Sequence, residues 1–393
     1  MFATLPVAEP DPILSLMAAF REDPRADKID LGVGVYRDAR GETPVFAAIR
    51  EAEVRLHAGQ TTKTYVGLTG DMGFVAALGA LSLGSDAAAL CAGAQCVGGS
   101  GALFVLGRLI RAAAPHTVVH LPNLTWPNHR NLLGQGAGLT TAAYPYLRGD
   151  GRAVDLPAML EAFDRLGPGD AVVLHASCHN STGIDPTPDD WAAIAASAAA
   201  RGWLPLFDAA YLGFGDGPDA DSAGMRTVLD AVPEALVAVS CSKTFGLYRD
   251  RVGAAYALLR DPGARAAAQG RLAAVNREHL SMPPDHGAAL VRLILNDTAL
   301  RATWNAELGA MRARINALRA ALDAALAATP GGGRWRGLAE GKGLFATLPL
   351  SPAQIVHLRE VHGIYVVPGG RVNIAGLPEG AAPRVAAALA ALD

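Results

Sequence analysis

Short apolar runs that end in polar residues recur along the first two thirds of the chain, and segments of helical pattern separate them. Four such runs lie at residues 117–121, 171–175, 203–207 and 237–239. Each is short and rich in β-branched or bulky apolar residues, which is typical of buried strands. Alanine-rich segments such as 192–200 have helix propensity and some amphipathic spacing. The pattern predicts an α/β fold.

A second pattern, near the C-terminal end, predicts one long helix. Its apolar residues recur every three or four positions and would form a single face. The run Pro-Gly-Gly-Gly at 330–333 ends the pattern. Strand-like stretches at 343–348 and 363–367 follow, and a short amphipathic helix is expected at 13–20. The residues of the long face are Leu300, Trp304, Leu308, Met311, Ile315, Leu318, Leu322 and Leu326.

Five residues with chemically useful side chains lie just beyond strand-like runs. They are Ser100, Trp126, Asn180, Asp208 and Lys243. Ligands of α/β proteins bind at the carboxyl edge of the sheet, where such residues would meet. The sequence therefore predicts a ligand site at that edge.

The stretch around Lys243 suggests what this ligand is. An amine held in a partly apolar site loses proton affinity and can act as a nucleophile. The hydroxyls of Ser240 and Ser242, with the guanidinium of Arg251, would form a phosphate cradle. Together they suggest a phosphorylated aldehyde, pyridoxal phosphate (PLP), held as a Schiff base. For this stretch alone, a surface lysine beside a loop is an equally good interpretation.

Glycines at 98, 99 and 101 lead into an apolar helical pattern. Free N–H groups at a helix N-terminus suit a phosphate. A dinucleotide fingerprint is the rival interpretation, but Phe104 stands where its third glycine would be. The histidines and cysteine at 175–179 do not predict a metal site, because no second Cys/His cluster supplies the remaining ligands.

Composition narrows the class of protein. The chain has 393 residues, of which 51% are hydrophobic and 18% charged, so it can bury a large core and form two or three domains. A net charge of −3 argues against nucleic acid as the main partner. Four scattered cysteines favour reduced thiols in the cytoplasm. We see neither a membrane-spanning run nor a signal peptide.

The segment from Ser240 to Gly253 resembles the cofactor-lysine segment of the class I aminotransferases, in particular the aspartate and aromatic amino acid aminotransferases. The likeness extends from residues 1–2 and 11–14 to 370–376, nearly the whole chain. It implies PLP fold type I. A large domain at 45–299 would contain a mostly parallel sheet of the seven-stranded type between helices. A smaller α/β domain would comprise residues 1–44 and 300–393, and the long helix would join the two.

The resemblance also implies how the cofactor is held and used. Lys243 would form the Schiff base and then move a proton as general acid and base. Asp208 would keep the pyridine nitrogen protonated, Tyr211 would bond the ring oxygen, and Trp126 would stack on the ring. These four are the candidate catalytic residues. The implied cofactor-binding set is Lys243, Gly99, Ser100, Trp126, His129, Asn180, Asp208, Tyr211, Ser240, Ser242, Arg251 and Tyr65.

Substrate binding is implied in the same way. Arg371 would grip the α-carboxylate through its planar fork, with Gly34, Trp126 and Asn180 beside it. Arg277 would bind a side-chain carboxylate across a homodimer interface. Two further features imply the same homodimer: Tyr65, which would reach the partner's cofactor phosphate, and residues 1–14, an arm that would cross to the partner.

One position departs from the family pattern. Ser181 stands where the relatives usually have proline, often preceded by a cis bond. A cis bond without proline costs about 3 kcal/mol. We therefore expect either a non-proline cis bond at 180–181 or a local displacement of Asn180.

The expected reaction is transfer of an amino group between an L-amino acid and a 2-oxo acid such as 2-oxoglutarate. Met282 and residues 26–28 resemble the aromatic group, whereas Arg277 admits aspartate and glutamate. A strict aspartate aminotransferase is the enzyme alternative. A non-catalytic PLP-binding module is the alternative of another class, but it is disfavoured because the chain retains both Lys243 and Arg371.

Overall fold

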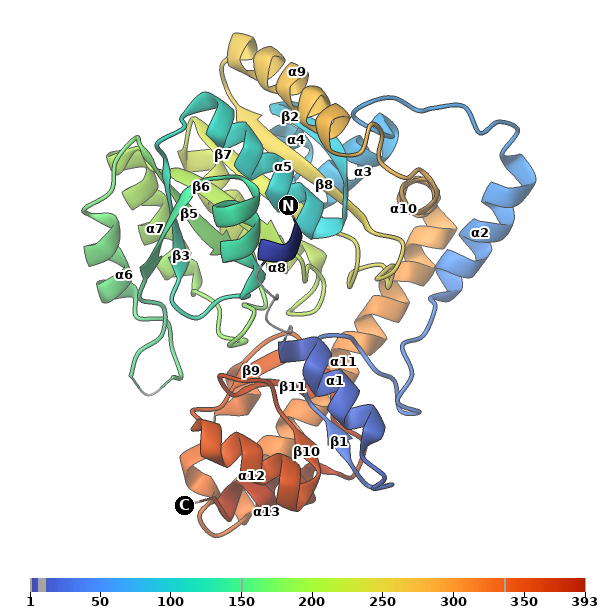
Figure 1. The fold of residues 1–393 in the computed structure, drawn as a ribbon. Coiled ribbons are helices and arrows are strands. Elements are labelled where there is room, and N and C mark those ends of the chain that lie inside the picture. The colour runs from blue at the N-terminus through green and yellow to red at the C-terminus, as the bar shows by residue number, and fades with distance from the viewer. Residues whose placement is uncertain (1, 6–11, 150, 336, 393) are drawn as a thin grey trace.

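The computed structural model describes residues 2–5, 12–149, 151–335 and 337–392. A seven-stranded sheet with the order β2-β8-β7-β6-β5-β3-β4 forms its larger part (Figure 1). Strand β8 is antiparallel to both neighbours, and the other pairs are parallel. This confirms the predicted α/β class with a mostly parallel sheet. The strands are β2 (Cys91–Val97), β3 (Val118–Pro122), β4 (Thr140–Tyr144), β5 (Asp170–His175), β6 (Leu204–Ala209), β7 (Glu234–Ser240) and β8 (Val252–Leu259).

Helices cover both faces of this sheet. Successive strand residues point to opposite faces, so Val173 of β5 packs in one apolar cluster while Val172 and Leu174 pack in the other. The first cluster includes residues of α5 (Gly98–Ala113), the π-helix η2 (Arg130–Gly136) and α9 (Pro262–His279). The second includes residues of α3 (Met72–Leu83), α6 (Leu156–Phe163), α7 (Pro188–Arg201), α8 (Pro218–Ala231) and α10 (His286–Asn296).

A smaller region contains two short pairs of strands. Strand β1 (Ile29–Asp30) pairs in parallel with β10 (Ile364–Tyr365), and β9 (Phe345–Thr347) pairs antiparallel with β11 (Arg371–Asn373). The N-terminal segment therefore packs with the C-terminal one, as Figure 1 shows. The helices of this region are α1 (Pro12–Glu22), α12 (Pro352–His362) and α13 (Ala382–Ala390). The domain boundaries at 45–299 and at 1–44 plus 300–393 stay a prediction.

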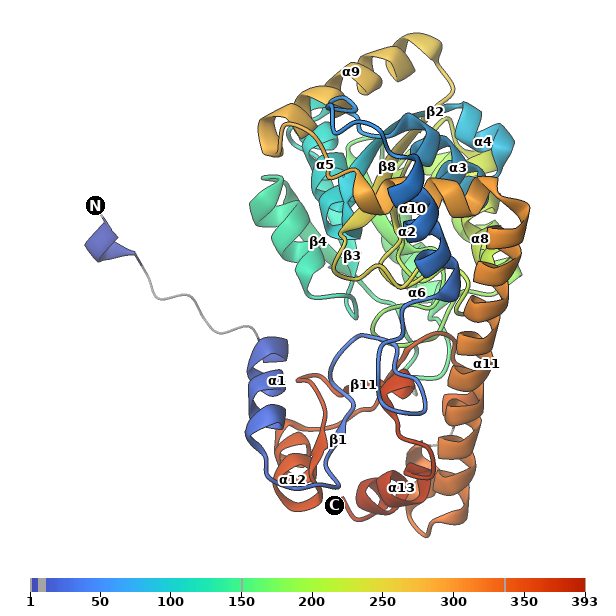
Figure 2. The same cartoon turned by 90° about the vertical axis from the view of Figure 1, so that its right-hand side faces the viewer.

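The long helix α11 (Thr298–Ala328) runs along one side of the molecule from the sheet to the smaller region (Figure 2). All eight residues of its predicted apolar face are buried, which confirms the periodicity. Asp297 caps its first turn by accepting a hydrogen bond from the backbone N–H of Leu300. Beyond its end lie the short helical turns η3 (Gly332–Trp335) and η4 (Leu338–Glu340).

The predicted N-terminal helix is confirmed as α1, whereas the predicted arm falls partly on residues 1 and 6–11, outside the described residues. The turn η1 (Phe2–Thr4) precedes α1, helix α2 (Ala47–Gly59) follows β1, and η5 (Ile374–Gly376) follows β11. The short helix α4 (Ser85–Ala89) connects α3 to β2. Across the described ranges, we find no helix with the length and apolarity needed to cross a bilayer.

Candidate active site

One cavity of about 240 Å³ lies at the carboxyl ends of β2, β3, β5, β6 and β7. Parallel strands end at a common edge, so residues far apart in the sequence meet there. The five residues that the strand pattern singled out all line this cavity. The predicted site residues found in its lining are Gly34, Gly99, Ser100, Trp126, Asn180, Asp208, Tyr211, Ser240, Ser242, Lys243, Arg251 and Arg371.

Lys243 follows β7 by three residues and provides the amine of the site. Its Nζ lies 4.8 Å from the centre of the Tyr211 ring. Burial lowers the pKa of Lys243 to about 8, with Asp208 opposing this shift and the cations Arg251 and Arg371 adding to it. About a tenth of the amine is therefore unprotonated at pH 7, far more than for an ordinary lysine, and the unprotonated form is the nucleophile.

Asp208, on β6, heads a chain of buried polar contacts. Its Oδ2 lies 3.0 Å from Nε2 of His129, whose Nδ1 lies 2.8 Å from Oγ1 of Thr125. Thr125 continues the chain to Nε2 of His175 at 3.1 Å. Burial alone would raise the pKa of Asp208, but the hydrogen bond and charge of His129 hold it below its usual value. Asp208 is therefore ionised and ready to pair with a cation in the cavity.

The N-terminus of α5 lines the cavity through Gly99 and Ser100. Gly98 has a φ of 71°, and a Cβ there would lie 2.6 Å from Nη2 of Arg251. Nη1 of Arg251 donates to Oγ of Ser242 at 3.3 Å, and a Cβ on Gly99 would lie 3.0 Å from Cβ of Ser240. Helix N–H groups, hydroxyls and a guanidinium thus lie close together, and side chains at these glycines would crowd Arg251 and Ser240. This donor set fits a phosphate group.

Arg371, on β11, approaches the cavity from the smaller region and is 7% exposed. Its Nη2 donates to the carbonyl oxygen of Gly32 at 2.9 Å, and its Nη1 donates to Oδ1 of Asn180 at 3.4 Å. Its Nε is buried without a partner among the described residues. A buried guanidinium with an unused donor is suited to an incoming carboxylate.

Asn180 stays in the cavity although Ser181 replaces the usual proline. Its Nδ2 donates to the phenol oxygen of Tyr211 at 3.2 Å. The structure contains no cis bond at 180–181, so the first of the two expected alternatives is wrong. The second, a local displacement of Asn180, stays a prediction. Three hydrogen bonds hold the loop: Asp185 accepts the N–H groups of Cys178 and His179, and Thr347 Oγ1 donates to the carbonyl oxygen of Ser181 at 2.9 Å.

Tyr65 and Arg277 do not reach the cavity within this chain. Tyr65 is 85% exposed, and the exposed Arg277 donates to Oγ of Ser281 at 2.6 Å. The segments that carry them pack together, since the N–H of Val66 lies 3.1 Å from Sδ of Met282. Their assignment to the site therefore stays a prediction.

The sequence analysis missed five residues of the lining: Ile13, Leu103, Ala210, Tyr248 and Phe345. Two of them, Tyr248 and Phe345, are aromatic. Tyr248 lies within the lysine segment, and its phenol oxygen accepts the N–H of Tyr36 at 3.1 Å. Its aromatic ring at a short distance from the lysine is a signal that could have identified it. Phe345 had no such signal, because a phenylalanine in a short strand is usually core.

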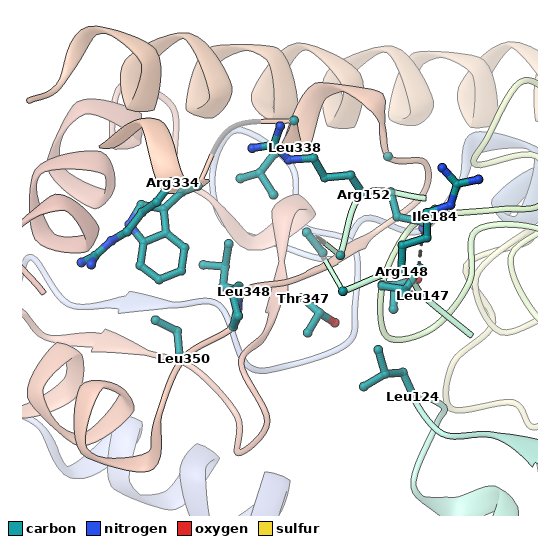
Figure 3. A pocket seen from close by; sticks show the side chains of 18 of the residues that line it. Leu124, Leu147, Arg148, Arg152, Ile184, Arg334, Leu338, Thr347, Leu348 and Leu350 are labelled. Carbon is teal, nitrogen blue, oxygen red and sulfur yellow. Dashed lines mark hydrogen bonds between the residues drawn. The ribbon is translucent and has the colours of Figure 1, made fainter. Parts of the chain in front are cut away.

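A second cavity, of about 360 Å³, lies between the smaller region and loops beyond the sheet (Figure 3). Its lining includes Arg148, Arg152, Leu338 and Thr347, but none of the predicted site residues. The candidate nucleophile Lys243, the carboxylate of Asp208 and the candidate phosphate cradle all belong to the smaller cavity, which is therefore the candidate active site.

Comparison with known proteins agrees with this assignment. A family model described as aminotransferase class I and II matches residues 26–389. An aromatic-amino-acid aminotransferase of Paracoccus denitrificans is 44% identical over 99% of this chain and 99% of its own length. An aspartate aminotransferase of Escherichia coli is 38% identical over the full length of both chains. A structure of an aromatic-amino-acid aminotransferase from Burkholderia pseudomallei, described as covalently bound to pyridoxal phosphate, superposes with a TM-score of 0.94. It is 37% identical, and the match covers 100% of this chain and 99% of that chain.

Proposed function

Since the chain belongs to the class I and II aminotransferase family and is a PLP-dependent transaminase, we propose that its amino donors are aromatic amino acids, together with aspartate and glutamate. The acceptor is a 2-oxo acid such as 2-oxoglutarate. The observation that carries the proposal is the convergence of Lys243, Asp208 and Arg371 on one cavity. The aromatic preference is supported by the identity of 44% to the Paracoccus enzyme against 38% to the aspartate enzyme.

The residues of the cavity fit PLP. Gly99, Ser100, Ser240, Ser242 and Arg251 would hold its phosphate. When bound, PLP supplies an electron sink for the carbanion that forms as the substrate loses its α-proton. The remaining cofactor contacts would come from Lys243, Trp126, Asn180, Asp208 and Tyr211, with His129 behind Asp208.

Proton transfer is the task of Lys243. Its Nζ, unprotonated above a pKa of about 8 and partly so below it, can take the proton from the substrate α-carbon and return it later. Asp208 stays ionised through His129 and so stabilises a positive charge beside it. Burial raises the pKa of Tyr211, so its phenol keeps its proton and remains a donor.

Substrate orientation is the task of Arg371. Its side chain is already fixed by the carbonyl oxygen of Gly32 and by Asn180, which limits the entropy lost on binding. A charge-assisted pair with the α-carboxylate would orient the amino group toward the cofactor. The indole of Trp126 would exclude water from one face of the cavity.

We also propose that the protein is a homodimer in which Tyr65 and Arg277 complete the partner's site. Both are exposed, and they lie on segments that pack together, so they would cross the interface as a unit. Exposed apolar side chains at Val66, Leu68 and Met72 follow Tyr65 along the chain. Sedimentation equilibrium should give twice the chain mass of 40.5 kDa. A fully active monomer would contradict this arrangement.

A cytoplasmic location is proposed because all four cysteines are free.

Single-turnover spectroscopy tests the choice of substrate. The PLP-loaded protein is mixed separately with aspartate and with phenylalanine, and the loss of its visible absorption band is followed. We expect both to react, at rates within about tenfold of each other. As a matched variant, Arg277→Ala should lose about 100-fold in rate with aspartate and little with phenylalanine, because only aspartate has a second carboxylate.

The other outcomes separate the alternatives. A reaction with aspartate alone would indicate a strict aspartate aminotransferase. No reaction with any amino acid, despite bound PLP, would indicate a non-catalytic PLP-binding module.

A further inference from the structure

Phe345 lies where the two short strands of the smaller region meet the cavity. In the β9–β11 pair, Phe345 is opposite Asn373 and Thr347 is opposite Arg371. Phe345 and Arg371 are therefore diagonal neighbours on one face of the pair, within reach of each other's side chains. The guanidinium carbon of Arg371 lies 4.5 Å from the centre of the Phe345 ring, a cation–π contact.

The same ring contacts a second site residue. The Tyr211 ring lies edge-on to it, with centroids 5.7 Å apart and planes at 81°. This is the edge-to-face geometry that aromatic pairs prefer. One phenylalanine thus supports both the candidate carboxylate ligand and the phenol proposed to bond the cofactor.

Gly34 limits the ring on a third side. A Cβ at Gly34 would lie 3.1 Å from Cζ of Phe345, so only glycine allows the ring to approach this backbone without adjustment. Phe345 is 1% exposed, and its ring has little freedom to move.

The backbone of Phe345 is fixed by an unusual buried cation. Arg319, on α11, is 1% exposed and has no carboxylate partner within the part of the chain that the structure describes. Its Nη2 donates to the carbonyl oxygens of Phe345 at 2.7 Å and Gly343 at 2.8 Å. Burial of a charge is costly unless it is hydrogen-bonded, so these bonds strongly favour one position for the segment.

The strand borders a cavity at the residues that follow Phe345, so hydrogen bonds contribute to its position there. Thr347 and Leu348 border the second cavity, as Figure 3 shows. Phe345 packs in the main apolar cluster, and Arg319 and the pairing with β11 add hydrogen bonds that hold this strand in place.

We propose that Phe345 is a positioning residue for transamination, whose ring keeps the guanidinium of Arg371 and the phenol of Tyr211 in one fixed relation. The proposal rests on the roles given above to those two residues. Carboxylate binding and the hydrogen bond to the cofactor would then depend on the same ring. Loss of the ring should disturb both together.

Phe345→Leu tests this, because it keeps an apolar side chain and removes the ring. We expect the Kd of 3-phenylpropionate for the PLP-loaded protein to rise about tenfold. This is the effect expected when a desolvated cation–π contact, here the one to Arg371, is lost. KM for both aspartate and phenylalanine should rise by more than kcat falls. The pH midpoint of the visible absorption band should move upward, because a less well directed phenol stabilises the deprotonated cofactor less.

The matched control is Phe163→Leu. Phe163 is fully buried on α6, contacts Tyr144 and Trp203, and lies outside the cavity. It should lower thermal stability without changing the Kd or the absorbance midpoint. If Phe345→Leu does not fold, Phe345→Met is measured in the same way.

A Phe345 variant with the wild-type Kd and wild-type midpoint would overturn the proposal. So would a change no larger than that in Phe163→Leu. Failure of the proposed function is a different result, since the wild-type protein itself would then show no reaction with amino acids.

Discussion

Replacement of Lys243 by alanine is expected to lower kcat by at least about 10⁴-fold for every amino acid. General acid–base groups contribute about 10²- to 10⁴-fold, and here the same amine also serves as the nucleophile. No other lysine is in the lining of the cavity, so no neighbour can replace it. The measurement is single-turnover loss of the visible band with aspartate and with phenylalanine.

Lys342→Ala is the matched control, because Lys342 forms an ion pair with Asp216 away from the cavity. It should react as the wild type does.

The pH dependence of PLP binding to the wild-type apo-protein gives a second test. Burial lowers the pKa of Lys243 to about 8, so covalent PLP capture should be slow well below that pH and should rise through it as the amine loses its proton. Covalent capture that is independent of pH, or a Lys243→Ala variant that retains 1% of kcat, would contradict the assignment.

The part of the site on the large sheet could be predicted because its signals are local. A short apolar run followed by a polar residue marks a strand end, and parallel strands bring their ends to one edge. Asp208 lies near the end of β6, Lys243 follows the neighbouring strand β7, and Asn180 follows β5 on the other side of β6. The buried face of α11 was predicted correctly for the same reason. A helical periodicity is visible in one segment alone, without knowing which residues pack against it.

What the sequence could not provide depends on contacts between distant segments. The insertion of antiparallel β8 between β2 and β7 pairs Cys91 with Leu258, and no local pattern encodes that pairing. The support of Arg371 by Phe345 follows from the register of β9 and β11. For Asn180 we expected a cis bond at 180–181 or a local displacement, but the bond is not cis, and distant partners, among them Thr347, hold the loop.

Replacement of Arg371 by methionine is expected to lower kcat/KM by about 10³-fold for aspartate and phenylalanine alike. Removing one partner of a buried, hydrogen-bonded charge pair costs about 2–5 kcal/mol. The loss should be equal because the α-carboxylate is common to both substrates. Arg371→Lys should recover only part of it, since an ammonium lacks the planar fork and is more costly to bury. Steady-state kinetics with both amino acids measures the effect.

The comparison of the two arginines then decides their roles. Arg371→Met should lower kcat/KM for both substrates, whereas Arg277→Ala should lower kcat/KM for aspartate alone. PLP binding should survive in Arg371→Met, because the phosphate cradle is formed by other residues, among them Arg251 and Ser242. If Arg371→Met instead lowered kcat/KM for aspartate and left kcat/KM for phenylalanine unchanged, the conclusion would be that Arg371 binds the side-chain carboxylate. The α-carboxylate would then need another partner, and the fixed guanidinium between Gly32 and Asn180 would set the choice of substrate instead of its orientation.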